Sequence, residues 1–441
     1  MHHPGHPVMR IAVVGSGISG LGAALRLSAQ HRVTLFEAAP RAGGHTNSVD
    51  VSLDGAHCAV DTGFLVFNER TYPELIALFD ELAVPTARSD MSFSVSIGPH
   101  RMEWCGSNFA ALFAQPRNAL RPSFWRMVND ILRFNRQATA LALGAARDGA
   151  LGAGALSEPL ADFLRRERYS DAFRDHYLLP MAAAIWSCPT SRMQQFPLGS
   201  FVRFFHNHGL LQIEDRPQWF TVAGGARQYV DRILARLDDV RLGTPVRAVS
   251  RRTTGVDGKV RVLTDAGTET FDHVVLACHS NQSLRLLDDA EDDERAVLAA
   301  VPYQPNRAWL HTDTALMPKR RSAWAAWNYL SNGDREAPEV SVTYWLNRLQ
   351  PLPFETPVLV SLNPLTPPAP DKVIASFDYE HPVFDAGSAA AQRRLGALQG
   401  RANTWFAGAW TGYGFHEDGL KSGLSVAASI LRRAPALRRA A

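Results

Sequence analysis

Apolar residues recur along the chain in patterns that predict different elements. Short runs of β-branched and aromatic residues at 11–14, 31–37, 271–279 and 405–407 predict strands buried on both faces, as in a parallel sheet. An alanine- and leucine-rich stretch follows the first run and predicts a helix through 23–27, and a second helix is predicted from about residue 419. The alternation of buried strands with helices indicates an α/β fold.

Two long segments interrupt these blocks. The first, from about 85 to 216, contains stretches such as 109–143 in which apolar residues recur every three or four positions with arginines between them, which predicts helices. The second, from about 301 to 394, contains short β-type runs such as "RAWLHTD" and "VSVTYWL" between proline-rich loops. The insertions together therefore predict a mixed α and β unit.

A glycine loop follows the first predicted strand. Gly15, Gly17 and Gly20 have the G-x-G-x-x-G spacing, Ser19 lies within the same loop, and a helix follows at once. This spacing allows a tight turn, a close approach of a pyrophosphate to the backbone, and close packing of helix on strand. Glu37 ends the next strand, where an acid can accept a hydrogen bond from a ribose. These residues predict a dinucleotide site, for either NAD or FAD.

The residues that follow resemble a flavoprotein family. Arg41, Gly43 and Gly44 in "EAAPRAGGHTNS" resemble the R-x-G-G signature of the superfamily of amine oxidases, protoporphyrinogen oxidase and phytoene desaturases. The resemblance implies that this glycine pair lies against the pyrophosphate and ribityl chain of FAD. His45 stands where the family usually has arginine.

Further blocks resemble the same family. Asp61 and Gly63 match a tight turn near the cofactor, and Val246 matches a backbone contact to adenine. The C-terminal "TWFAGAWTGYGFHEDGLKSG" is similar to the family's flavin motif. There the resemblance implies that an acid binds the ribityl chain or pyrophosphate and that a helix N-terminus faces the flavin. The residues that it assigns to cofactor binding are Gly408, Glu417, Asp418 and Gly419.

The resemblance implies a two-part architecture. The expected FAD-binding domain is Rossmann-like, of the glutathione-reductase type, and discontinuous. It comprises residues 9–84, 217–300 and 395–433, whereas 85–216 and 301–394 form an inserted, mixed α+β substrate domain. Residues 1–8 and 434–441 are expected to be flexible ends.

Composition and cysteine usage limit the functional classes and the kinds of site to expect. The 441 residues are 46% hydrophobic with a net charge of +3 and no dense basic stripe, so nucleic-acid binding is not expected. The four cysteines are far apart and are expected to be free thiols. No cysteine follows Cys278, so none is available in the region where the monoamine oxidases of the resembled superfamily attach their flavin, and the resemblance implies non-covalent FAD. His and Cys lack the spacing of ligands, so no metal site is expected.

The sequence predicts a cytoplasmic protein with one possible membrane contact. The first ten residues have no apolar core, so a signal peptide is not expected, and no apolar run is long enough to span a bilayer. The segment from Phe109 to Phe134, with its interleaved arginines, could lie on a membrane surface. An ordinary amphipathic helix packed on the domain is the alternative.

The insertions suggest an apolar substrate. Aromatic residues within them could line a dry pocket or could simply build the core: Trp186, Phe204, Phe205, Trp324, Trp327, Tyr329, Tyr344 and Trp345. We therefore expect an FAD-dependent oxidoreductase that transfers a hydride from a fatty acyl-like or isoprenoid-like substrate to flavin N5, as a desaturase or an isomerase. Oxygen or a quinone would take up the electrons. The alternatives are a flavin-dependent amine oxidase and a non-redox FAD-binding protein.

Two residues are candidates for the chemistry. His416 precedes the acid–glycine pair of the C-terminal motif, near the place where amine oxidases have a tyrosine over the flavin, and Tyr413 is a weaker candidate for the same wall. A histidine there could hold a polar group or move a proton. The lysine that amine oxidases place near flavin N5 has no counterpart in "VPYQPNRAWLHTD"; Lys319 follows later and is expected on the surface.

Overall fold

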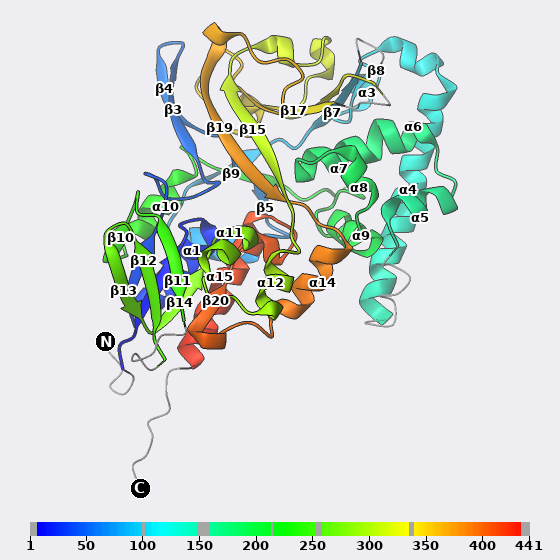
Figure 1. Ribbon diagram of the computed structural model, residues 1–441. Helices are drawn as coiled ribbons and strands as arrows, with labels where there is room; N and C mark the ends of the chain where they lie inside the picture. Colours follow the sequence, from blue (N-terminus) through cyan, green and yellow to red (C-terminus); the bar gives the residue numbers. More distant parts are fainter. Residues whose placement is uncertain are drawn as a thin grey trace.

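The computed structural model in Figure 1 describes most of the chain. The described residues are 7–98, 102–148, 158–212, 215–251, 258–334 and 339–433. Most of the expected flexible ends, residues 1–6 and 434–441, lie outside these ranges. Among the described helices, none combines the length and the apolar character needed to cross a bilayer.

A five-stranded parallel sheet is the centre of the lower half in Figure 1. Its strands, in spatial order, are β10 (Asp239–Arg241), β2 (Arg32–Phe36), β1 (Arg10–Val14), β14 (His273–Leu276) and β20 (Thr404–Phe406). All four strand pairs are parallel, and β1 lies between β2 and β14. The predicted α/β fold with a Rossmann-like sheet is therefore confirmed.

Alternate residues of β1 face two separate cores. Ile11 and Val13 pack with helices on one face, whereas Ala12 and Val14 pack on the other. This alternation explains why the strand is apolar throughout. The first face is covered by α1 (Ile18–Ser28), α2 (Pro73–Glu81), α10 (Arg227–Leu234) and α15 (His416–Arg432). The second is covered by a three-stranded antiparallel sheet and two helices: β11 (Val246–Ser250), β12 (Val260–Thr264), β13 (Gly267–Phe271), α12 (Asp292–Leu298) and α14 (Ala386–Leu395).

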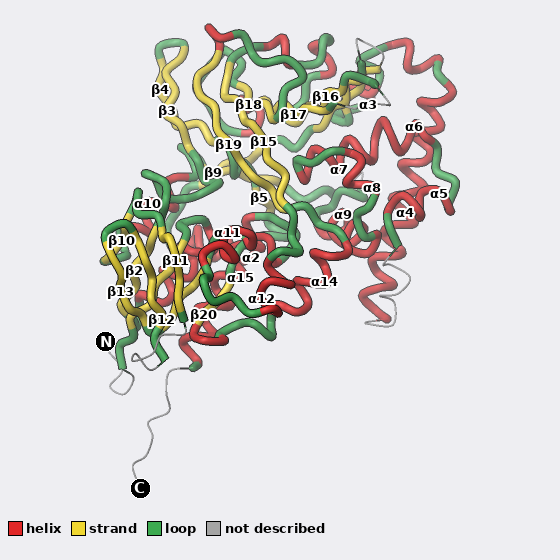
Figure 2. The backbone as a smooth tube through the Cα atoms, viewed as in Figure 1, coloured by secondary structure: helices red, strands yellow, loops and turns green. Residues whose placement is uncertain are grey.

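A seven-stranded sheet forms the upper half (Figure 2). Its strands, in spatial order, are β19 (Val373–Pro382), β15 (Tyr303–His311), β18 (Leu359–Leu362), β17 (Val340–Trp345), β16 (Trp327–Ser331), β7 (Phe93–Ile97) and β8 (Met102–Cys105). Since β7 and β8 come from the first insertion and the other five from the second, the two insertions share one sheet. The exact domain boundaries stay a prediction.

Helices of the first insertion pack beside this sheet. They are α3 (Phe109–Leu112), α4 (Pro122–Asp148), α5 (Leu160–Arg166), α6 (Asp171–Phe173), α7 (Leu179–Trp186), α8 (Thr190–Gln194) and α9 (Leu198–Asn207). The expectation of helices is right for these residues but incomplete, because β6 (Thr86–Ser89), β7 and β8 also lie in this insertion. The signal for β7 is the period-two alternation of Phe93, Val95 and Ile97 with serines.

Smaller elements join the two halves. The strands β3 (Ser48–Leu53) and β4 (Ala56–Asp61) form a hairpin, and β9 (Trp219–Val222) pairs with both β5 (Phe67–Asn68) and β6. The short helices α11 (Ser280–Leu286) and α13 (Leu346–Leu349) follow β14 and β17. In both figures, β5 and β9 lie at the boundary between the two large sheets, where the chain passes from one half of the molecule to the other.

Glycines bring α1 and α15 into close contact. A side chain at Gly423 would overlap the backbone of Ser19, and one at Gly22 would meet the Leu420 side chain at 2.6 Å. Glycine at these positions therefore allows the two helices to pack with their backbones almost touching. The N-termini of both helices, at Ile18 and His416, consequently lie at the same cavity.

The Gly423→Ala variant should be destabilised. The added methyl group would force α1 and α15 apart, at a cost of about 1–3 kcal/mol for overpacking a tight contact. Thermal and urea unfolding would measure the change. Gly144→Ala in α4 is the matched control, because a side chain there meets nothing within 4 Å and should stabilise the helix by about 0.5–1 kcal/mol. Equal effects of the two substitutions would contradict this account of the contact.

Candidate active site

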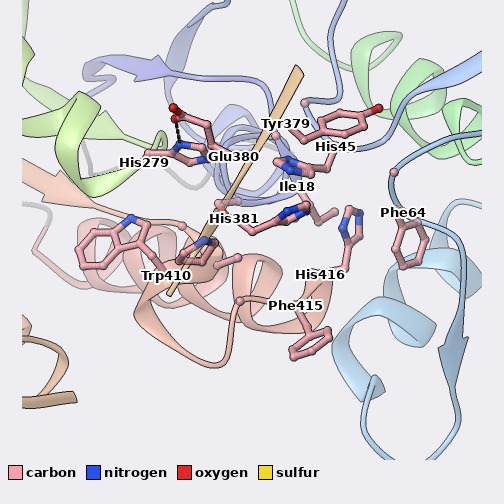
Figure 3. Close-up of a pocket in the computed structure, with 18 of the residues that line it drawn as sticks. Ile18, His45, Phe64, His279, Tyr379, Glu380, His381, Trp410, Phe415 and His416 are labelled. Carbon is pink, nitrogen blue, oxygen red and sulfur yellow. Dashed lines mark ion pairs between the residues drawn. The ribbon is translucent and has the colours of Figure 1, made fainter. Parts of the chain in front are cut away.

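One elongated cavity lies between the two halves of the molecule. Its volume is about 650 Å³, within the range of cofactor and ligand sites. One end is formed by the glycine loop after β1, by Glu37 and by Val246. Many of the other lining side chains come from the insertions, and His416 also lines the cavity (Figure 3). The cavity therefore runs from the parallel sheet into the inserted part.

The glycine loops form a narrow cradle at the first end. Gly15 has a φ of 103°, and a side chain there would meet Ala277 O at 2.7 Å. A side chain at Gly44 would approach the Gly17 Cα to 3.2 Å, whereas the space beside Gly17 is open. Gly17 is the N-cap of α1 without a side-chain hydrogen bond, and the first turn contains no acidic residue. Amide groups and a helix dipole therefore face the cavity, as a pyrophosphate requires.

The carboxylate of Glu37 lies at the cavity wall beyond this cradle. Its Oε2 accepts hydrogen bonds from Ser16 N at 2.9 Å and Ser16 Oγ at 2.5 Å, and its Oε1 accepts one from Ala39 N at 2.9 Å. These bonds hold the carboxylate in one orientation, and each oxygen keeps acceptor capacity for a ribose hydroxyl. Val246, the first residue of β11, lines the same end of the cavity.

The structure brings only some of the sequence-predicted cofactor residues to the wall. Those that line the cavity are Gly15, Gly17, Ser19, Glu37, Gly43, Gly44, Gly63, Val246 and Gly408. Those that do not are Gly20, Arg41, Asp61, Glu417, Asp418 and Gly419. The cofactor roles of the first group stay predictions that the geometry supports, and the second group has other contacts.

Several residues of the second group support the wall from behind. A side chain at Gly20 would overlap the Gly15 carbonyl, and one at Gly419 would meet Ile18 and Ser19 within 3.0 Å, so both glycines allow close packing. Arg41 is exposed and donates weak hydrogen bonds, the shorter to Thr46 O at 3.4 Å.

The acids of the C-terminal motif cap helices. Glu417 accepts hydrogen bonds from Glu74 N and Leu75 N, both at 3.0 Å, and thus caps α2. Asp418 accepts one from Phe415 N at 3.0 Å, so it caps its own helix. The prediction that this helix begins at about Gly419 is therefore wrong by three residues, since α15 begins at His416. Burial raises the pKa of Asp418 to about 6.

Asp61 joins three segments beneath the cavity. Its carboxylate accepts hydrogen bonds from Ala226 N at 2.9 Å, from Gln350 Nε2 at 2.6 Å and from Ser48 Oγ. Thr62 and Gly63, which follow it, line the cavity. Asp61 therefore orients the tight turn without facing the cavity itself, and burial raises the pKa of its carboxyl to about 6.

His416 is held firmly at the cavity wall. Its ring stacks on Phe64 with 3.9 Å between centroids and 12° between planes. Its Nε2 lies 2.7 Å from Tyr229 Oη and 3.2 Å from Thr46 Oγ1. These two hydroxyl groups are hydrogen-bonded to each other. Burial lowers the pKa of the imidazole to about 3, so the ring is neutral at physiological pH. Tyr413, the weaker candidate, does not line the cavity but packs with the aromatic core, where its carbonyl accepts from Trp186 Nε1.

Four more histidines line the cavity; His208 stacks on Phe204, and sequence reasoning missed the convergence of the other three. His45, His279 and His381 surround the same space as His416 (Figure 3), with His45 5.2 Å from His381 and 6.5 Å from His279 between ring centroids. The His45 ring also stacks on Tyr379 at 5.0 Å. Burial lowers the pKa of all three, that of His381 to about 4.

Hydrogen bonds decide the tautomer of His381. Asn306 Nδ2 donates to Gln304 O at 3.0 Å and lies 2.8 Å from His381 Nδ1, and Asn306 Oδ1 accepts from Asn363 Nδ2. The amide group of Asn306 is therefore oriented, and His381 Nδ1 must accept. The neutral ring then carries its proton on Nε2, as a hydrogen-bond donor. No sequence signal pointed to this residue, because it becomes a neighbour of Asn306 only through the pairing of β15 with β19.

The far end of the cavity is apolar. Its lining side chains include Leu65, Val66, Met91, Ile185, Leu210, Trp219 and Leu362. Of the eight aromatic residues that the sequence singled out, Phe204, Trp327 and Tyr344 line the cavity, and the other five do not. We call this end, with Phe204, Trp327 and Tyr344, the apolar chamber.

The described cavity wall contains no lysine. Lys319 comes eight residues after the end of β15 and is exposed as expected, and its backbone N donates to Glu103 Oε1 at 2.7 Å. The carboxylates on the wall are Glu37, at the ribose end, and Glu380, whose Oε2 lies 3.4 Å from His279 Nδ1. Among the described residues, no cluster of His, Cys, Asp and Glu has the geometry to hold a metal ion, and all four cysteines are unpaired.

A family model for flavin-containing amine oxidoreductases matches residues 18–431. The chain belongs to this family. No curated protein sequence matches the chain at a significant level. As members of the flavin-containing amine oxidoreductases use FAD, the protein is an FAD-dependent oxidoreductase.

Solved structures agree in fold. A conjugated-linoleic-acid-producing fatty acid isomerase from P. acnes is 16% identical, with a TM-score of 0.67 over 96% of this chain and 98% of its own. Cyclohexylamine oxidase from Brevibacterium oxydans is 16% identical, with a TM-score of 0.69 over 97% and 99%. A putrescine oxidase bound to putrescine is 18% identical, with a TM-score of 0.65 over 97% and 100%. At these identities the likeness extends to the fold and not to the substrate.

The residues of this flavin oxidoreductase fit FAD. The open space beside Gly17, the bare N-terminus of α1 and the Gly43–Gly44 loop suit the pyrophosphate, and the oriented Glu37 carboxylate suits a ribose. The start of α15 lies further along the same cavity, with its positive dipole end at His416. Non-covalent attachment stays a prediction.

The Asp61→Asn variant should change how stability depends on pH. Since burial raises the folded-state pKa of Asp61 from 3.8 to about 6, the wild type binds this proton more tightly when folded. The stabilisation is present below about pH 4 and is lost as pH rises through about 6, a change of about 3 kcal/mol. Asp61→Asn lacks this loss. The difference in the free energy of unfolding between the wild type and Asp61→Asn, measured in urea, should therefore change between pH 4 and pH 7.

The matched control is Asp265→Asn. This exposed carboxylate has a pKa lowered by its hydrogen bond from Arg247, so its own contribution has the opposite sign and should be small. A wild-type minus Asp61→Asn difference that stays constant from pH 4 to pH 7 would show that the Asp61 carboxyl titrates normally.

Proposed function

We propose that the protein oxidises or isomerises an apolar carbon chain of the fatty acyl or isoprenoid type. When bound, FAD supplies the acceptor for a hydride at its N5 atom. The observation that carries the proposal is the apolar chamber, which lies beyond His416 in the same cavity as the FAD cradle. Apolar chains bind there by burying surface, at about 25 cal/mol per Å².

The charges of the cavity support an uncharged reacting group. An ammonium group in the apolar chamber would need an ionic partner, since an unpaired buried charge is very costly. The described wall of the chamber offers no such partner, because Glu37 lies at the opposite end and Glu380 is beside His279. The histidines nearby are held neutral by burial, so they neither repel nor attract a charged substrate strongly.

A flavin-dependent amine oxidase is the second candidate. The observation that favours it is Glu380, whose side chain is 46% exposed at the cavity wall and could pair with a cationic amine. That role would require Glu380 to exchange its contact with His279 for the substrate. Family membership is compatible with both candidates.

His416 has the contacts of a residue that moves a proton. Formation or migration of a double bond requires a proton to leave one carbon or to reach another. The Thr46, Tyr229 and His416 groups are hydrogen-bonded to one another, and each hydroxyl can donate or accept. Reversal of these hydrogen bonds would change the ring nitrogen that carries the proton. A neutral imidazole with its proton on Nε2 can therefore accept a substrate proton at Nδ1 while Nε2 keeps its proton or passes it to Tyr229 Oη, and the reverse sequence returns a proton to the substrate.

His381 has a different proposed role. Its Nδ1 accepts from Asn306, so its Nε2–H is a donor that cannot serve as a base while that bond holds. Such a donor can hold an oxygen atom, for example of a substrate carbonyl, close to the reacting carbons. The proposed chemistry requires that the surrounding aromatic rings keep water out of the apolar chamber, which protects reactive intermediates.

A substrate panel tests the proposal. Under anaerobic conditions, unsaturated fatty acids or isoprenoid chains should bleach the flavin absorbance, whereas spermine, putrescine and benzylamine should not. The reason is the chamber, which buries an alkyl chain but offers no partner to an ammonium group. Readmission of oxygen or addition of a quinone then identifies the electron acceptor. Rapid bleaching by the amines, with no reaction of the apolar chains, would favour the amine oxidase instead.

The His416→Ala and His416→Phe variants should keep FAD but react slowly. Loss of the group that moves the proton should lower the rate of flavin reduction by about 10²–10⁴-fold. Tyr229→Phe keeps the aromatic ring but removes the hydroxyl partner of Nε2, and it should lower the rate less and alter its pH dependence. His57→Ala, at an exposed histidine on β4, is the control. Unchanged rates in both His416 variants, with full FAD content, would remove this residue from the chemistry.

A further inference from the structure

One helix face carries a large share of the exposed apolar surface. Among the described residues, eight large apolar side chains are strongly exposed, and four of them lie within 24 residues of one another. These are Leu120, which is 86% exposed just before α4, and Trp125, Leu132 and Leu143 on α4, at 43%, 43% and 46%. Single exposed apolar residues need no explanation, but such a cluster does.

The three residues on α4 share one side of the helix. Leu132 and Leu143 follow Trp125 by seven and 18 residues. At about 100° per residue, these spacings place all three side chains within about 20° of a common direction. We call this side of α4, together with Leu120, the α4 outer face.

The opposite side of α4 already supplies its packing. Phe124, Met127, Phe134 and Ala138 are fully buried in the core that α4 shares with α9. Apolar residues on the outer face are therefore not needed to attach the helix to the fold. In Figure 1, α4 runs along the outer edge of the helical layer, away from both sheets.

The charge around this face is strongly basic. Arg117, Arg126 and Arg136 are exposed and Arg121 is half-buried, all within or beside the same stretch. Asp130 is the sole acidic residue between 109 and 147 in the sequence. Its carboxylate is mostly buried, pairs with Arg133 at 3.0 Å and accepts a hydrogen bond from Ser170 N. Basic side chains, with one paired carboxylate among them, thus surround the exposed tryptophan and leucines.

We propose that the α4 outer face binds the surface of an anionic phospholipid bilayer. An exposed indole with leucines inserts at the boundary of headgroups and acyl chains, while arginines above it attract anionic phosphates. A second copy of this chain fits less well, because pairing the face with itself would bring arginines against arginines. The contact is peripheral, since none of the described helices is suited to cross the bilayer.

The α4 outer face is connected to the cavity through α9. α4 packs on α9, and Phe204 of α9 lines the apolar chamber. The two helices α4 and α9 therefore separate the α4 outer face from the proposed substrate site. Membrane binding itself does not depend on the proposed function, because it is measured without substrate.

Vesicle binding of the full-length holoprotein tests the proposal. Sedimentation with phosphatidylcholine vesicles containing about one-third phosphatidylglycerol should bind the wild type at low salt, and about 0.5 M NaCl should weaken binding by screening. Vesicles of phosphatidylcholine alone should bind at least about tenfold less, in line with the loss of the arginine contribution. The double variant Leu120→Gln/Trp125→Gln and the double variant Arg126→Gln/Arg136→Gln should each lose about tenfold or more in binding.

Matched variants elsewhere on the surface provide the controls. Leu242→Gln and Leu263→Gln replace leucines that are 40% and 41% exposed, close to the 43% of Trp125, and Arg261→Gln replaces an exposed arginine on β12. They should bind vesicles as the wild type does, and flavin absorbance confirms that every variant is folded. No binding of the wild type to anionic vesicles, or equal losses in control and face variants, would overturn the proposal. A dimer that the Leu120→Gln/Trp125→Gln variant dissociates would also overturn it, as a second copy would then cover the face.

Discussion

The backbone contact between α1 and α15 is the constraint on which the site depends. It joins residues almost 400 positions apart and is possible because Gly22 and Gly423 leave room for the neighbouring helix. Since both helices begin at one cavity, their positive dipole ends lie at the same space. A bulkier residue at either glycine would move the two helix ends relative to each other. The cofactor half of the site is therefore a property of helix packing as much as of the glycine loop.

Local signals in the sequence were enough to predict the cofactor end. The glycine loop, Glu37 and β1 are neighbours in the chain, so their spacing largely determines their geometry. The acids of the C-terminal motif were harder to place. Adjacent residues on a helix point about 100° apart, so Glu417 reaches α2 while Asp418 caps α15. Which partner each acid finds depends on tertiary packing that no local pattern contains.

Prediction of the substrate end of the cavity would have required knowledge of how the strands pair. His381 meets Asn306 because β19 pairs with β15, and the two strands are separated by more than 60 residues of chain. Likewise, Tyr344 lines the chamber opposite Trp327, whereas Trp345 points to the other face of β17 because side chains alternate along a strand. A sequence pattern shows that these residues are aromatic. It does not show which face of the sheet turns toward the cavity.

A dry chamber places a condition on the chemistry. If the proposed reaction takes place without bulk water at the reacting carbons, a proton that leaves the substrate must pass to a side chain, and that side chain must be neutral before it accepts. Burial keeps His416 neutral, and the hydroxyls of Tyr229 and Thr46 connect it to the protein interior rather than to solvent. The same burial disfavours a persistent imidazolium, so a proton held at His416 would be returned readily. An arrangement that accepts and returns one proton is compatible with migration of a double bond as well as with net desaturation, so the proposed function includes both reactions.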